Sequence, residues 1–228
     1  MIEIIGVIAS YFIGAIPFGY VVVKAIKGVD VREYGSKNIG ATNAARVLGW
    51  PFFIVVFSLD FAKGFVPCLL IARHVGQPSW GTPSPHVVTI LCGLFAICGH
   101  IWPIYMGFKG GKAVAAAAGV FFWIAPKAAG VALAAFAIVF LTFRYVSLGS
   151  ICASAALIAA AVWFEPNRTG KGLPLLVFCA LVALLVIVRH KTNIQRLLAG
   201  TESRVRFGGK RKGGTGGGIP TQGSSQSQ

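Results

Sequence analysis

The chain has 228 residues, of which 56% are hydrophobic and only 12% charged, and its formal net charge at pH 7 is +15. A soluble domain usually has about twice that charged fraction, so an ordinary soluble protein is excluded. The polar residues are clustered between long, continuously apolar runs. This pattern predicts an all-α integral membrane protein, and the absence of alternation with period two argues against a transmembrane β-barrel.

Seven apolar segments are candidate membrane spans. Several are shorter than the roughly 20 residues that cross a bilayer untilted. The fourth is the shortest, and we expect it to be a half-span or to lie partly buried beside a protein-lined cavity. Five long spans with re-entrant pieces would give a similar pattern. In chain order the candidates are Ile2–Lys24, Pro51–Arg73, His86–Tyr105, Lys112–Ile124, Pro126–Phe143, Ser147–Phe164 and Leu173–Val188.

The basic residues predict the orientation of about seven transmembrane helices. Sixteen Lys and Arg residues follow odd-numbered spans or lie in the C-terminal region, and only Arg73, Lys127, Arg168 and Lys171 lie on the opposite side. Under the positive-inside rule the N-terminus is outside and the C-terminus cytoplasmic. The first span lacks a basic segment before it, so no cleavable signal peptide is expected. With positive charges flanking helices, anionic headgroups and anionic substrates are expected partners, and nucleic acid is not.

The chain divides into a single membrane domain, residues 1–206, and a tail, residues 207–228. The tail combines a basic patch with Gly, Ser and Gln repeats. Such a composition predicts disorder, and its positive charge suits contact with anionic lipid. We assign it no chemistry.

The first of three polar segments is Tyr34–Gly49. Glycines let backbone N–H groups approach a ligand closely, while hydroxyl, amide and guanidinium groups supply donors around an anion. A polar connection between two helices is the alternative reading. The candidate site residues here are Gly35, Ser36, Asn38, Gly40, Thr42, Asn43 and Arg46.

The second polar segment, Gly107–Ala113, precedes the short fourth span, and His100 lies shortly before it. A glycine-rich turn at a helix N-terminus presents free N–H groups to phosphate. The spacing is not that of a nucleotide P-loop. The alternative is a positively charged turn that only obeys the topology rule. The candidates are His100, Lys109, Gly110, Gly111 and Lys112.

The third polar segment, His190–Arg204, follows the last span. His190 and Asn193 are three residues apart and share one face of a helix. A histidine at a helix end is also a common cap. Glu202 is one of six acidic residues in the chain and could orient an Arg or Lys side chain.

Two ionisable residues, Asp60 and Lys63, lie inside the second span. Charged groups in a membrane span are costly and normally face the bundle interior. An i,i+3 ion pair that neutralises both charges is the simplest expectation. The functional reading is an electrostatic support beneath the first polar segment.

The five cysteines lie in apolar segments, and no His, Cys and Asp cluster has the spacing of a metal site. Paired carboxylates for glycoside chemistry and a Gly-x-Ser-x-Gly elbow are also missing. We therefore expect no metal and no cofactor. Arg, Lys and Gly dominate the polar segments, which suits a phosphorylated substrate.

Together the three segments resemble the bacterial acyl-phosphate:glycerol-3-phosphate acyltransferase family. Its Gly-Ser-Gly-Asn loop, Gly-His…Phe-Lys-Gly-Gly-Lys segment and His-x-x-Asn-Ile-x-Arg-Leu ending correspond to Gly35–Gly49, Gly99–Lys112 and His190–Glu202. The resemblance extends from the first span to about residue 206. Lys37 departs from the family glycine, and we expect its charge to tune phosphate affinity. Ala113 and Ala116 replace the usual Gly and Thr, which concerns helix packing more than chemistry.

The resemblance implies an acyltransferase of the bacterial cytoplasmic membrane, with its active site facing the cytoplasm. It would transfer a fatty acyl group from acyl-phosphate to the 1-hydroxyl of sn-glycerol 3-phosphate, the first acylation step of phospholipid biosynthesis. No obligatory protein partner is implied, and a monomer is expected. The catalytic candidates are Ser36, Arg46, Lys112, His190 and Asn193.

Two other classes of function fit parts of the pattern. A transporter or exchanger of a phosphorylated small solute also uses broken helices, Gly-rich turns and buried charges. Against it, the polar residues gather at one face and no inverted repeat is visible. A structural membrane scaffold leaves the three basic segments unexplained.

Overall fold

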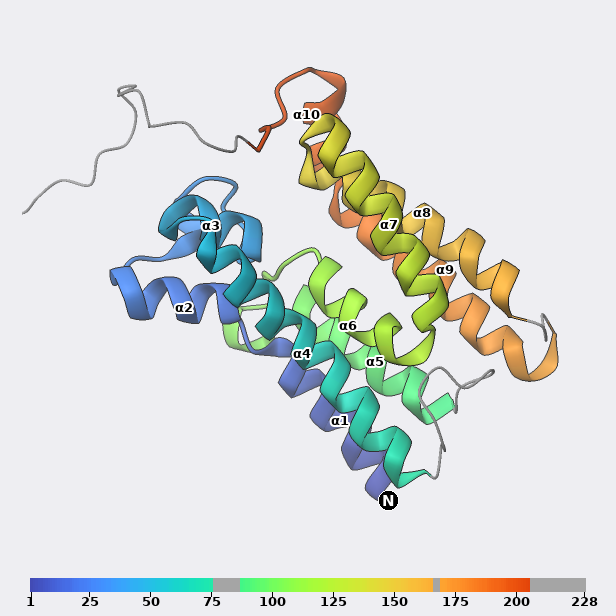
Figure 1. The fold of residues 1–228 in the computed structure, drawn as a ribbon. Coiled ribbons are helices and arrows are strands. Elements are labelled where there is room, and N and C mark those ends of the chain that lie inside the picture. Colours follow the sequence, from blue (N-terminus) through green and yellow to red (C-terminus); the bar gives the residue numbers. More distant parts are fainter. Residues whose placement is uncertain (76–86, 166–168, 206–228) are drawn as a thin grey trace, which may run out of the picture.

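The computed structural model describes residues 1–75, 87–165 and 169–205, and the regular secondary structure of these residues is all helical (Figure 1). Three short 3-10 helices connect the longer elements, at Val31–Glu33, Ile104–Met106 and Gly170–Gly172. The α-helices are α1 (Ile2–Ala15), α2 (Phe18–Lys27), α3 (Ala41–Leu48), α4 (Pro51–His74), α5 (Val87–Ile101), α6 (Val114–Ile124), α7 (Pro126–Phe143), α8 (Val146–Phe164), α9 (Leu173–Arg189) and α10 (Lys191–Leu198).

Long apolar helices confirm the membrane class. In the described residues, five stretches are long and apolar enough to cross a membrane, and α9 with α10 forms a sixth, bent by 57°. The five stretches are Ile2–Lys27, Pro51–His74, Val87–Met106, Pro126–Phe143 and Val146–Phe164. The expected fourth span is α6, which has only 11 residues and is mostly buried. A buried half-span therefore describes α6 better than a full crossing.

The first span differs from the continuous helix expected over Ile2–Lys24. It breaks at Ile16 and Pro17 and resumes as α2 up to Lys27. Proline has no N–H for the helical ladder and clashes with the preceding turn, so a break at Pro17 follows. The freed carbonyl of Ile16 accepts a 2.7 Å hydrogen bond from Nζ of Lys63 on α4.

The helices form two groups that meet along α6. Helices α1, α4, α5 and α6 pack against one another, and α7, α8 and α9 form the second group (Figure 1). Glycines allow close helix contacts in the first group. A Cβ atom at Gly64 would lie 2.1 Å from the carbonyl oxygen of Ala116, and one at Gly14 would lie 2.1 Å from that of Ala96. Such small-residue contacts are typical of membrane helix packing.

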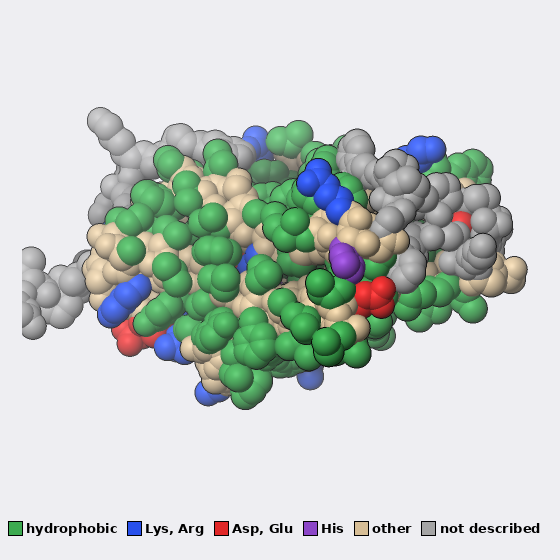
Figure 2. Space-filling model, turned by 90° about the horizontal axis from the view of Figure 1, so that it is seen from below, with side chains coloured by type: hydrophobic (Ala, Val, Ile, Leu, Met, Phe, Trp, Pro, Cys, Tyr) green, Lys and Arg blue, Asp and Glu red, His purple; other side chains and the backbone are tan. Residues whose placement is uncertain are grey.

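Apolar side chains cover much of the outer surface, as Figure 2 shows for one face. Helix α7 is the most exposed, with large side chains such as Leu133, Ile138 and Leu141 more than 60% accessible. In a soluble protein this would be an unfavourable surface, but in lipid it costs nothing. The predictions for His86, Arg168, Arg206 and the tail 207–228 concern positions outside the described residues.

Candidate active site

One cavity of about 680 Å³ receives side chains from all three polar segments, as their shared position on one side of the membrane predicts. It lies between the two helix groups, beneath the loop that leads into α3. Its polar lining includes Ser36, Asn38, Gly40, Thr42, Asn43, Arg46, Asp60, His100, Lys112, Ser147, His190, Asn193 and Glu202. Segments that are up to 166 residues apart in the chain therefore form one site.

Asn43 organises the first segment from within. Its Nδ2 lies 2.9–3.0 Å from the carbonyl oxygens of Val31, Tyr34 and Asn38, which share its two N–H donors, and its Oδ1 accepts from the N–H of Ser36 at 2.9 Å. The side-chain amide of Asn43 is fully buried, and both its N–H donors and its oxygen are hydrogen-bonded within the loop. We infer that Asn43 shapes the loop and that substrate contact is left to its neighbours.

Two departures from the family pattern fall on left-handed backbone. Lys37 has φ of +57° and Ala113 has φ of +60°, a region that residues other than glycine rarely adopt. Lys37 is exposed and does not line the cavity, so the structure gives no support for a direct contribution of its charge to phosphate binding. Ala116 packs against Gly64, as expected for a packing residue.

The second segment corrects the expectation of free amides. The N–H groups of Phe108, Lys109, Gly110 and Gly111 each donate to a carbonyl oxygen of residues 100–106, at 2.9–3.4 Å. Amides that are already paired cannot also cradle a phosphate. The side chain of Lys109 is exposed and does not line the cavity. From this segment, Lys112 is the cation that reaches the site.

Lys112 connects the second segment to the third. Its Nζ donates to Oδ1 of Asn193 on α10. Burial lowers the pKa of the Lys112 ammonium to about 8. The carboxylate of Glu202 opposes this shift, and three positive charges reinforce it, those of Arg196, Arg46 and Arg189. Among the described residues no carboxylate lies within ion-pair distance of this half-buried ammonium, so a phosphate dianion would stabilise its charge.

Glu202 is the acceptor that orders the third segment. Its carboxylate receives hydrogen bonds from Nε of Arg196 at 2.6 Å, Nδ2 of Asn193 at 2.6 Å and the hydroxyl of Ser147 on α8 at 2.7 Å. Burial raises the pKa of Glu202, but these hydrogen bonds and the Arg196 charge outweigh it, and the net shift is downward. The expectation that Glu202 orients an Arg is confirmed.

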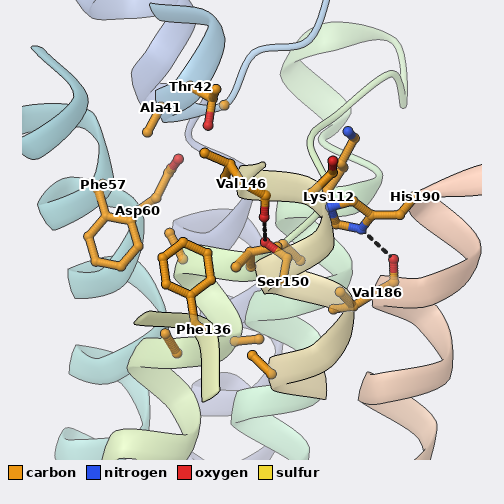
Figure 3. Close-up of a pocket in the computed structure, with 18 of the residues that line it drawn as sticks. Ala41, Thr42, Phe57, Asp60, Lys112, Phe136, Val146, Ser150, Val186 and His190 are labelled. Carbon is orange, nitrogen blue, oxygen red and sulfur yellow. Dashed lines mark hydrogen bonds between the residues drawn. The ribbon is translucent and has the colours of Figure 1, made fainter. Parts of the chain in front are cut away.

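His190 lies at the bend between α9 and α10, 3% exposed. Its Nδ1 is 2.7 Å from the carbonyl oxygen of Val186, so Nδ1 carries the proton (Figure 3). In the neutral ring, Nε2 is then the lone-pair nitrogen. Neutral His190 can accept a hydrogen bond from a hydroxyl group, whereas contact with a phosphate oxygen needs the protonated ring.

The intramembrane ion pair is confirmed. Nζ of Lys63 lies 2.7 Å from Oδ1 of Asp60, and both side chains are almost fully buried. Nδ1 of His100 lies 3.7 Å from the same carboxylate oxygen. Asp60 and His100 also face the cavity, so this charged group forms part of its wall.

The remaining lining is apolar and reaches down between the helices. Phe53, Phe57 and Phe61 form a ladder on α4, with ring centroids 5.8 and 6.5 Å apart. Phe136 of α7 also lines the cavity, near Phe57 in the view of Figure 3. The site therefore offers charged groups at one end and a wall suited to hydrocarbon along the rest.

Three residues that hold parts of the site in place were not among the candidates chosen from the sequence. Ser147 and Arg196 hold Glu202, and Arg189 donates to the carbonyls of Gly110 and Gly111 at 3.2–3.3 Å. Ser147 was counted as the start of a span and Arg189 as a topology charge. Only the basic character of Arg189, next to His190, could have singled it out.

The fold and site define a class: a helical integral membrane protein whose cationic and polar residues open onto a largely apolar cavity. The profile of the glycerol-3-phosphate acyltransferase family matches residues 4–200. The chain belongs to this family.

Individual relatives show the same similarity along almost the whole chain. A glycerol-3-phosphate acyltransferase of Acholeplasma laidlawii is 42% identical over 216 residues, which cover 89% of this chain and 92% of the relative. One of Aquifex aeolicus is 42% identical over 200 residues, covering 87% and 96%. The crystal structure of PlsY (YgiH), an integral membrane glycerol 3-phosphate acyltransferase in its glycerol 3-phosphate form, is 39% identical with a TM-score of 0.80. That match covers 90% of this chain and 96% of PlsY.

Proposed function

We propose that this chain transfers a fatty acyl group from acyl-phosphate to the 1-hydroxyl of sn-glycerol 3-phosphate, releasing lysophosphatidate and inorganic phosphate. The observation that carries the proposal is one shared cavity, in which the three polar segments form one end and the aromatic ladder of α4 lines another part. A charged end suits a phosphorylated acceptor, and an apolar wall suits an acyl chain. Relatives named glycerol-3-phosphate acyltransferase and the PlsY structures with glycerol 3-phosphate and lysophosphatidic acid support this choice.

Glycerol 3-phosphate would bind at the charged end. Arg46 and Lys112 supply two positive charges near one another, since each lies within electrostatic range of Glu202 and Arg196. Ser36 lines the same end and adds a hydroxyl donor. Asn193 holds the Lys112 ammonium, so its role is to aim that charge as well as to line the site.

The acyl donor would lie along the apolar wall, with its phosphate near the start of α3. The first amides of a helix have no partner within the helix, and Ala41 and Thr42 at the start of α3 line the cavity. In the glycine-rich turn, the N–H groups of Phe108, Lys109, Gly110 and Gly111 are paired, so these four amides do not form a second cradle. Lys112 would therefore be the main contact that the second segment makes with phosphate.

In the reaction, the glycerol hydroxyl oxygen forms a bond to the carbonyl carbon of the donor. The bond from that carbon to the phosphate oxygen breaks, and phosphate leaves with the electron pair. The hydroxyl proton passes either to a phosphate oxygen or to Nε2 of His190, which has the lone pair for this role. Because acyl-phosphate is already activated, positioning and charge stabilisation supply most of the rate.

We further propose that the enzyme resides in the bacterial cytoplasmic membrane as a monomer, with the N-terminus outside and the site facing the cytoplasm. The concentration of positive charge on the side of the three polar segments supports this orientation. Cysteine labelling from either side of the membrane at Lys37 and at Lys127, both exposed, checks it.

The decisive experiment measures lysophosphatidate and phosphate release by purified protein given palmitoyl-phosphate and glycerol 3-phosphate. Palmitoyl-CoA serves as a parallel donor and Arg46→Ala as control. We expect product from acyl-phosphate alone, with at least a 100-fold loss in the control, as for a lost preorganised donor. Product formation from palmitoyl-CoA only would overturn the assignment of acyl-phosphate as the acyl donor. A folded protein that makes no product, but moves labelled glycerol 3-phosphate into vesicles, would instead be a transporter.

A further inference from the structure

The turn before Lys112 is held between two helices. Gly110 and Gly111 lie against the end of α5 on one side and against Arg189, the last residue of α9, on the other. Lys112 follows directly. The position of this turn therefore determines where the Lys112 ammonium can reach.

The α5 side of the contact leaves no room for adjustment. The N–H of Gly110 donates to the carbonyl of Ile101 at 3.2 Å, and that of Gly111 donates to the carbonyl of His100 at 3.0 Å. A Cβ atom at Gly111 would lie 2.1 Å from Nε2 of His100, and one at Gly110 would lie 2.2 Å from the His100 carbonyl oxygen. Glycine is required here because the turn rests directly on His100.

The α9 side consists of a single forked contact. Nε of Arg189 donates to the carbonyl of Gly111 at 3.3 Å, and Nη2 donates to that of Gly110 at 3.2 Å. Among the residues that the structure describes, no carboxylate lies within ion-pair distance of this guanidinium. Two successive carbonyls match the planar fork of Arg, and a lysine ammonium cannot reproduce this geometry.

We propose that Arg189 is a positioning residue of the acyl-transfer site, which clamps the Gly110–Gly111 turn onto the end of α5 so that Lys112 is aimed at the substrate phosphate. The inference rests on the proposed function for its substrate. This role goes beyond that of a positive charge that only sets membrane orientation, because the guanidinium of Arg189 donates hydrogen bonds to the turn.

Arg189 also acts on Lys112 through its charge. The charged groups around the Lys112 ammonium are Glu202, Arg196, Arg46 and Arg189, and His190 faces it from the bend. Removing the positive charge of Arg189 raises the pKa of Lys112, and the alkaline decline of activity moves to higher pH. Two substitutions of Arg189 can therefore separate the effect of its positive charge from the effect of its forked hydrogen bonds.

The test compares Arg189→Gln, Arg189→Lys and the control Lys191→Gln, which removes an exposed positive charge two residues away. For Arg189→Lys we expect the KM for glycerol 3-phosphate to rise about tenfold while the alkaline limb stays in place, because the fork is lost and the charge kept. For Arg189→Gln we expect a similar or larger rise in this KM, and the alkaline decline of activity should move to higher pH. Lys191→Gln should match wild type in both.

Two results would overturn the clamp. Arg189→Lys with wild-type KM would show that only the charge matters. A purely structural role would be shown if Arg189 variants yielded less folded enzyme, but the enzyme that did fold had wild-type KM for glycerol 3-phosphate and a wild-type alkaline decline of activity.

A second measurement is independent of turnover. Purified protein without substrate is acetylated with an amine-reactive ester between pH 6 and 10, and mass spectrometry follows Lys112 with Lys191 as internal reference. We expect the midpoint for Lys112 near 8 in wild type and higher in Arg189→Gln. An unchanged midpoint and rate would contradict the inference, even if wild-type protein failed to acylate glycerol 3-phosphate and the proposed function fell.

Discussion

At the scale of single residues, the site works by dividing its polar groups into those that bind and those that aim. Asn43 and Glu202 are saturated by their neighbours and hold the first and third segments in shape. Arg46 and Lys112 keep charge available to a ligand. The chain alone could name all four, because each lies in a polar segment, but their roles depend on which donors and acceptors are already paired.

Arg46→Lys tests whether a fork or only a charge is needed. Lysine keeps the positive charge and loses the planar pair of donors that matches phosphate. We expect kcat/KM for glycerol 3-phosphate to fall about 100-fold, as for a lost preorganised donor. Steady-state kinetics with palmitoyl-phosphate in excess measures it. Near-normal activity would refute the phosphate-clamp role.

The pH dependence follows from Lys112, whose pKa is lowered by burial to about 8. Below this pH the ammonium is charged and binds phosphate, and above it the charge is lost. Glycerol 3-phosphate has already gained its second charge near pH 6 and adds no change here. We therefore expect kcat/KM for glycerol 3-phosphate to decline above about pH 8.

Lys112→Arg is the matched control for this decline, because a guanidinium stays protonated throughout the range. Its activity will be lower, but its profile should remain flat to at least about pH 10. An alkaline limb at the same pH in both proteins would assign the titration to another group.

At the scale of elements, loops carry strain that the helices do not. The chain enters α3 through a loop that contains left-handed backbone at Gly35 and at Lys37. Gly35 suits its position, since a Cβ atom there would lie 2.4 Å from Oδ1 of Asn43. Lys37 does not, because a lysine in this conformation is strained. For Lys37 we therefore predict an effect on stability in place of the expected effect of its charge on phosphate affinity.

Lys37→Gly should stabilise the protein by roughly 0.5–1 kcal/mol, the relieved strain being partly offset by the greater freedom of glycine in the unfolded chain. Thermal unfolding in detergent measures the change. Lys37→Ala removes the same charge and keeps the strained conformation, so it should bring no gain. Equal stabilisation by both variants would attribute the effect to charge.

At the scale of the whole molecule, the cavity joins a charged end to a wall between the two helix groups. Ala132 and Leu133 of α7 and Ala153 of α8 line this wall opposite the aromatic ladder of α4. Small residues there leave space that an acyl chain can occupy. The selection of acyl-chain length should therefore depend on these positions and leave glycerol 3-phosphate binding unchanged.

Ala132→Phe tests this by filling the apolar part of the cavity. We expect the ratio of turnover with 16-carbon to 10-carbon acyl-phosphate to fall about tenfold, with the KM for glycerol 3-phosphate unchanged, because overpacking affects only the longer chain. Ala134→Phe is the matched control, since Ala134 on the same helix is exposed and does not line the cavity. Equal effects of both substitutions would place the acyl chain elsewhere.

The membrane class, the order of the three polar segments and the Asp60–Lys63 pair were readable from the chain. Apolar runs and i,i+3 spacing are local properties, and helices in lipid must satisfy their own backbone. The short, buried α6 was also expected, because the fourth apolar run is too short to cross a bilayer. The break at Pro17 was not foreseen. Hydropathy averages over a window, so it marks apolar character better than the point where a helix ends.

Tertiary structure decided the contents of the site. The glycine-rich turn reads as a phosphate cradle in the sequence, but the amides of Gly110 and Gly111 are paired with the end of α5, which lies about ten residues earlier. Arg189 reads as a topology charge, but α9 brings it against that same turn. Residue types and spacing show which groups can donate or accept; only the packing of α5, α6 and α9 shows which of them are already satisfied, and a satisfied group cannot bind substrate.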